Sequence, residues 1–69
     1  MNQIEIRVNG EQRRVSEGLS VEELLRELDL QPRMIVVEHN GDILRRERYA
    51  EVAVGAGDAF ELVHFVGGG

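Results

Sequence analysis

The sequence predicts an α+β domain with two layers, in which one helix packs on one face of a mixed sheet of four to five strands. Residues 20–30 carry apolar side chains at helical spacing, whereas the segments on either side alternate or run apolar as strands do. A single helix can cover only one face of a sheet. The 69 residues suffice for one domain with a thin core.

The first part of the chain predicts a β-hairpin. Residues 4–8 alternate apolar and polar side chains, as in a strand with one buried face. Asn9-Gly10 follows and is a strong signal for a two-residue turn. Residues 12–16 then return as a second, more polar strand.

The helix has the clearest sequence signals. Ser20 is the expected N-cap, and Glu23 three residues later completes a capping box. Pro32 is expected to end the helical run, because proline disfavours helical geometry in the residue before it. One apolar stripe on the helix consists of Val21, Leu24, Leu25 and Leu28.

The second half of the chain predicts further strands. Residues 34–40 are apolar and β-branched and predict a central strand, after which Asn40-Gly41 predicts a turn. A short strand is expected around residues 43–44, and residues 59–66 form the last strand after a loop at 55–58. The helix is a crossover that favours a parallel strand pair near the middle of the sheet. This order outlines a β-grasp fold, the architecture of ubiquitin.

The composition excludes several classes of function. There is no cysteine, which excludes disulfides, thiolate zinc sites and thiol nucleophiles. The net charge of -5 argues against a nucleic-acid partner and mildly favours a basic protein partner. No apolar run approaches the ~20 residues of a membrane span, and no signal-peptide pattern is visible at the start. We therefore expect a cytoplasmic protein with neither nucleic-acid nor membrane partners.

Ordinary catalytic patterns are absent from the sequence. His39 and His64 lack the spacing of metal ligands, and no phosphate-binding or dinucleotide-binding glycine motif is present. Asp58 is expected to form hydrogen bonds at its turn. Arg46 and the nearby Tyr49 belong to a local basic segment, for which we favour partner contacts or internal ion pairs. No metal and no bound cofactor are expected.

Three glycines, Gly67, Gly68 and Gly69, close the sequence. They are either an inert tail or the working part of the protein, following a domain of residues 1–66. Without Cβ atoms, such a tail can enter a narrow active site. The α-carboxylate of Gly69 is ionised at neutral pH and can attack the α-phosphate of ATP held by a partner enzyme. Because the chain has no phosphate loop, this partner must supply the activation.

The whole sequence resembles the ThiS family, the ubiquitin-like sulfur carriers of thiamine thiazole biosynthesis. The resemblance rests on "IEIRVNGE", "LSVEELLRELDL", "GAGDAFELVHFVGGG" and above all "HNGDILRRERY". The last is similar to the family segment Asn-Gly-x-(Ile/Val)-x-x-Arg-x-x-(Trp/Tyr), with Arg46 and Tyr49 on its arginine and aromatic positions. Family members often have proline where this chain has Arg45, which leaves the local turn geometry open.

The resemblance implies a reaction cycle. A ThiF-like adenylyltransferase would use ATP to adenylate Gly69, and a cysteine desulfurase system would provide persulfide sulfur to form a thiocarboxylate. A ThiG-like thiazole synthase would then accept the sulfur. The chain would be a carrier and not an enzyme.

The last strand offers a docking surface for these partners. If Phe60 and Leu62 face the helix, Val63 and Phe65 point outward and form an apolar patch beside the tail. The alternative is that the strand is covered on both faces, which a continuous apolar run does not decide.

Three other functions remain open at this point. A related carrier is the small subunit of molybdopterin synthase, although this chain is short for that family and lacks its usual Pro-Pro before the tail. A sulfur carrier for tRNA thiolation is equally compatible with the sequence. The third is an interaction module with an inert tail.

Overall fold

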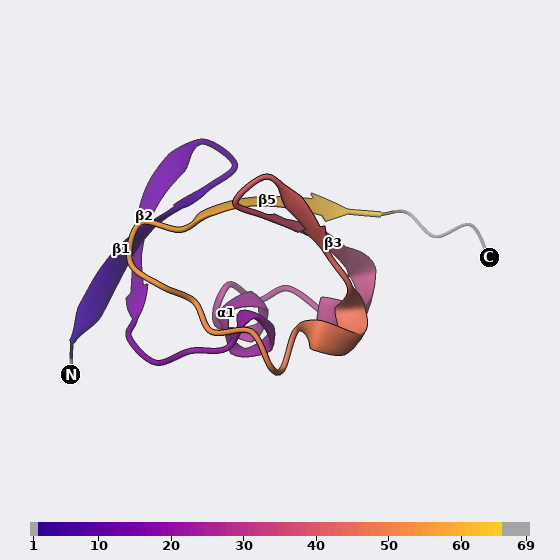
Figure 1. Cartoon of the computed structure of the whole chain (residues 1–69), viewed down its shortest axis with the longest axis horizontal. Helices are drawn as coiled ribbons and strands as arrows, with labels where there is room; N and C mark the ends of the chain where they lie inside the picture. Colours follow the sequence, from indigo (N-terminus) through magenta and orange to yellow (C-terminus); the bar gives the residue numbers. More distant parts are fainter. Residues whose placement is uncertain (1, 66–69) are drawn as a thin grey trace.

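The computed structural model describes residues 2–65, which form a mixed sheet with a helix against one face (Figure 1). In this range the sheet has five strands in the order β2-β1-β5-β3-β4. The elements are β1 (Gln3–Val8), β2 (Glu11–Ser16), α1 (Val21–Glu27), η1 (Pro32–Met34), β3 (Ile35–His39), β4 (Asp42–Leu44), η2 (Arg46–Arg48) and β5 (Ala59–His64), where η marks a 3-10 helix. The predicted β-grasp architecture is confirmed. The predicted boundary at residue 66 and the tail lie outside the described residues.

The parallel pair lies near the middle of the sheet, as predicted, but it joins β1 to β5, the first and last strands. The other pairs, β1–β2, β3–β5 and β3–β4, are antiparallel. The strands that the α1 crossover connects, β2 and β3, are separated by β1 and β5. The last strand therefore lies in the centre of the sheet, held on both sides.

Both predicted asparagine-glycine turns are present. Asn9 and Gly10 have φ angles of 51° and 84°, and Asn40 and Gly41 have φ angles of 51° and 91°. Two consecutive positive φ angles are the requirement of the type I′ hairpin turn, whose twist matches that of the flanking strands. These turns set the registers of β1–β2 and β3–β4.

The start of α1 agrees with the prediction. The hydroxyl of Ser20 accepts a hydrogen bond from the backbone N–H of Glu23 at 3.1 Å, and the Glu23 carboxylate accepts one from the N–H of Ser20 at 2.9 Å. Val21, Leu24 and Leu25 are fully buried against the sheet. Leu28, the fourth member of the predicted stripe, is half-buried.

The end of α1 differs from the prediction. The helix ends at Glu27, before Pro32, and Asp29 adopts a left-handed φ of 62°. The N–H of Asp29 donates to the carbonyl of Arg26 at 3.0 Å, and the N–H of Leu30 donates to the carbonyl of Leu25 at 2.8 Å. This pair of bonds is a Schellman motif, which satisfies the last carbonyls of the helix. Pro32 instead opens η1.

The segment after β4 closes the domain over the start of α1. The N–H groups of Val21 and Glu22, which have no partner inside the helix, donate to the carbonyls of Val52 and Tyr49, each at 2.9 Å. Residues 50–54 contribute an isolated bridge between Ala53 and Ser20. No helix of the described range has the length and apolar character that crossing a bilayer requires.

Candidate functional site

Strand β5 carries the chain toward the glycines and is anchored along its length. Its register with β3 extends to the pair Ile35 and His64, and one residue further the N–H of Phe65 donates to the carbonyl of Met34 at 3.0 Å. On the β1 side, the Asn9 amide accepts from the N–H of Leu62 at 2.8 Å and donates to its carbonyl at 3.2 Å. The position and direction of the chain are therefore fixed as far as Phe65.

The clamp from Asn9 is a role that the sequence analysis did not assign. The sequence predicts a turn at Asn9, and the structure shows that the Asn9 side chain also continues the β1–β5 pairing where the β1 backbone turns away. The sequence holds no signal for this contact, because 53 residues separate the two partners.

The two faces of β5 have opposite characters. Phe60 and Leu62 are buried toward α1, whereas Val63 and Phe65 have exposed fractions of 57% and 41%. This is the alternation expected if the helix covers one face, and the alternative of a strand covered on both faces is wrong. The predicted positions of Val63 and Phe65 at the surface are confirmed, and their contact with a partner stays a prediction.

The sheet adds two apolar residues to this surface. Val36 on β3 lies directly opposite Val63, and Ile43 on β4 shares the same outward face. Both are exposed, Ile43 to 65%. We call Val36, Ile43, Val63 and Phe65 the outer patch. An exposed cluster of this kind is typical of a protein-interaction site.

Tyr49 does not belong to the surface. Its side chain is only 4% exposed, and its hydroxyl donates to the carbonyl of Ile35 at 2.8 Å. Burial raises the pKa of Tyr49. This effect outweighs the hydrogen bond with the Val37 backbone and the positive charge of Arg46, both of which lower the pKa. The prediction that Tyr49 contacts a partner is therefore corrected: the ring is a core element that fixes η2 against β3.

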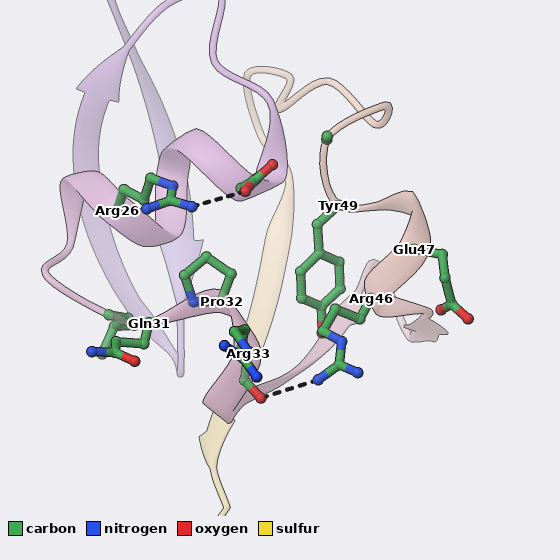
Figure 2. Close-up of a pocket in the computed structure, with 10 residues that line it drawn as sticks. Arg26, Gln31, Pro32, Arg33, Arg46, Glu47 and Tyr49 are labelled. Carbon is green, nitrogen blue, oxygen red and sulfur yellow. Dashed lines mark hydrogen bonds and ion pairs between the residues drawn. The ribbon is translucent and has the colours of Figure 1, made fainter.

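Arg46 is exposed beside a cavity of about 510 Å³ between α1, η1 and η2 (Figure 2). One of its Nη atoms donates to the carbonyl of Arg33 at 3.4 Å, and Figure 2 shows the guanidinium next to that carbonyl. Arg26 also lines the cavity, and its guanidinium forms an ion pair with the Glu22 carboxylate at 3.0 Å. Arg46 is thus accessible to a partner, in keeping with the prediction, which stays untested.

A polar cluster lies at the opposite end of β5 from Phe65. The Asp58 carboxylate contacts His39 Nε2 at 2.9 Å and accepts from the Asn40 amide at 3.2 Å and from the N–H of Gly55 at 2.8 Å. Burial alone would raise the pKa of Asp58, but these hydrogen bonds and the charge of His39 lower it overall. The His39 ring also stacks on Phe60. This cluster ties the β3–β4 turn to the 55–58 loop, and its role is structural.

The comparisons with known proteins agree with this architecture. The model of the ThiS family matches residues 6–69. The chain belongs to the ThiS family. A crystal structure of the thiamine biosynthesis protein ThiS from Geobacter metallireducens superposes with a TM-score of 0.82 at 40% identity, covering 96% of this chain and 100% of that one.

Two curated relatives extend this ThiS-family assignment. The sulfur carrier protein ThiS of Bacillus subtilis is 42% identical over 50 residues, which is 72% of this chain and 76% of that protein. A thiazole synthase of Paramagnetospirillum magneticum is 47% identical over 62 residues, or 90% of this chain. This chain spans only 19% of that longer protein. The prediction of ThiS membership is confirmed, and the small relative from Bacillus subtilis is itself named a sulfur carrier protein.

Proposed function

We propose that the chain is the sulfur carrier of thiamine thiazole formation and that Gly69 is the residue that carries the sulfur. The supporting observation is that the match to the ThiS family extends through residue 69. A relative of this chain, from Bacillus subtilis, is named sulfur carrier protein ThiS. The anchored β5 strand supports the same role, because its pairing with β3 and the hydrogen bond from the N–H of Phe65 fix the chain up to the residue before this terminal segment.

In the proposed cycle, the Gly69 carboxylate attacks the α-phosphorus of ATP on a ThiF-like adenylyltransferase, and pyrophosphate leaves. A cysteine persulfide, supplied by a desulfurase system, attacks the acyl carbon, and AMP leaves. A thiol then reduces the S–S bond, and the sulfur stays on Gly69 as a thiocarboxylate. Since the chain has no cysteine, every sulfur nucleophile in this sequence of steps comes from partners. ATP is consumed by the partner and is not a cofactor of the carrier.

The proposed sulfur acceptor is a ThiG-like thiazole synthase. The support is the relative from Paramagnetospirillum magneticum, in which a segment similar to this chain belongs to a protein named thiazole synthase. Covalent linkage of two interacting modules raises their effective concentration. Val63 of the outer patch lies on β5 and Phe65 directly follows that strand, so a docked acceptor would contact the segment that precedes the glycines in the sequence. This favours the thiamine carrier over the molybdopterin and tRNA alternatives.

Intact mass spectrometry tests the proposal directly. The protein is incubated with ATP, its cognate adenylyltransferase and a persulfide donor. We expect a mass gain that matches replacement of one oxygen by sulfur, and fragmentation should locate the change at Gly69. A wild-type protein that keeps its mass, while a known carrier is converted by the same reagents, would show the tail to be inert.

A further inference from the structure

Two glutamates face each other across the centre of the sheet. Glu38 on β3 lies directly opposite Glu61 on β5 in the antiparallel register. Glu61 is exposed and Glu38 is half-buried. Like charges at directly opposed positions destabilise a strand pair. The two carboxylates therefore lower the stability of the isolated carrier.

No arginine neutralises this acidic pair within residues 2–65. The ion pairs found there join Arg26 to Glu22, His39 to Asp58 and Arg48 to Glu51. On the β1 side of β5, the outward-facing Arg7 pairs in register with Ala59, two residues before Glu61, and makes no ion pair with it. Glu38 and Glu61 thus present two adjacent carboxylates without a cation from this range.

Apolar side chains flank the acidic pair on two sides of the same face. Val36 and Val63 form the next outward pair along β3 and β5, and Ile43 lies opposite Glu38 on β4. Figure 1 shows α1 on the other side of these strands, so this face has no covering element in the described structure. The surface combines a negative charge with apolar side chains on two sides, and β5 leads from it directly to Phe65.

We propose that this surface docks onto the thiazole synthase and receives one of its arginine side chains between Glu38 and Glu61. Arginine fits because its planar guanidinium can donate to two carboxylates at once, while its methylene stem packs against valine side chains. This inference rests on the proposed function. The choice of the thiazole synthase follows from the closeness of the surface to Phe65, at the end of the described chain, and from the relative named thiazole synthase that contains a segment similar to this chain.

The arrangement separates the effect of the glutamates on folding from their effect on binding. In the free carrier, the two carboxylates repel each other. In the complex, the partner's guanidinium replaces this repulsion with charge-assisted hydrogen bonds in a site shielded from water. Neutralising the pair should therefore leave the free protein equally stable or more stable, and should weaken the complex.

The experiment compares the affinity of three proteins for the cognate thiazole synthase. These are the wild type, the double variant E38Q/E61Q and a control, E11Q/E17Q, which makes the same charge change at exposed positions on β2 and just after it. We expect E38Q/E61Q to bind at least about tenfold more weakly and the control to stay within about twofold. Raising the salt concentration should weaken the wild type more than E38Q/E61Q.

The outcomes distinguish this inference from the proposed function. If wild-type protein accepts sulfur in the mass assay but E38Q/E61Q binds as well as wild type, or wild type does not bind the synthase, the docking proposal is overturned. It is also overturned if E38Q/E61Q loses affinity only for the adenylyltransferase. Failure of wild type to accept sulfur overturns the carrier function itself. A melting temperature at or above wild type for E38Q/E61Q shows that a weaker complex is not due to misfolding.

Discussion

The Tyr49 hydroxyl donates a hydrogen bond to the carbonyl oxygen of Ile35 at 2.8 Å, from a side chain with only 4% exposure. This contact joins η2 to the first residue of β3, next to the point where β5 ends opposite Ile35. It stabilises the end of the sheet next to Phe65, where the described part of the chain finishes.

Replacement of this tyrosine tests its structural role. Y49F removes the donor and should lower the free energy of unfolding by about 1 kcal/mol, whereas Y49A should cost about 3–5 kcal/mol because it also leaves a cavity. Denaturant titration measures both changes. Y49F should still accept sulfur at the wild-type rate; a selective loss of sulfur transfer at unchanged stability would restore the partner contact that the sequence suggested.

The outer patch can be separated from the core by matched substitutions. V36T/V63T keeps β-branched side chains at exposed positions and should change the free energy of unfolding by less than about 0.5 kcal/mol per site. V37T places the same hydroxyl at a position with 0% exposure and should lower the free energy of unfolding by about 1–3 kcal/mol. In titrations with the thiazole synthase, V36T/V63T should bind several-fold more weakly. Unchanged binding would remove Val36 and Val63 from the docking surface.

The capping box of α1 gives a test of local stability. S20A deletes the oxygen that accepts from the N–H of Glu23 and should lower the unfolding free energy by about 1 kcal/mol. S20D supplies an equivalent acceptor near the helix N-terminus and should recover most of the loss. Thermal melts followed by circular dichroism are sufficient, and equal melting temperatures for S20A and wild type would contradict the assignment.

The Asp58 cluster predicts a pH-dependent contribution to stability. The pKa of Asp58 is lowered in the folded protein, so the group is more acidic there than in the unfolded chain, where it titrates near about 3.9. Its contribution is complete above that unfolded value and is lost as the pH falls through the lower folded pKa. The stability difference between wild type and D58N should therefore shrink as the pH falls below about 4. A difference that grows on acidification would have the wrong sign.

The tail is tested by changing its length. Deletion of Gly69, or addition of one residue after it, should abolish formation of the thiocarboxylate, because the proposed reacting carboxyl group is removed or displaced. The melting temperature should stay at the wild-type value. A large drop in melting temperature on deletion would instead assign the glycines a structural role.

Features that depend on near neighbours were predictable. Asn9-Gly10 predicts a type I′ turn because few other dipeptides tolerate two positive φ angles. Ser20 and Glu23 predict the start of α1 because both capping bonds span three residues. The end of α1 was missed because Asp29, and not glycine, adopts the left-handed conformation. Aspartate adopts this conformation less readily than glycine, so the sequence points to Pro32 as the end of the helix.

The candidate site was predictable only in part. Alternation in β5 indicated that Val63 and Phe65 would be exposed if the helix covered the other face, and the structure shows that it does. Tyr49 was misassigned because its neighbours in sequence are exposed and charged. Only the three-dimensional structure brings its ring into the core and its hydroxyl to the Ile35 carbonyl.

The sequence alone therefore determined the local elements of this protein, its lack of thiol chemistry and its resemblance to the sulfur carriers. The tertiary structure decided which strands are neighbours and in which register. That register places Val36 beside Val63 and Glu38 beside Glu61. The reason is physical: turn and capping preferences act between residues a few positions apart, whereas strand register depends on burying one whole face of a sheet against the helix.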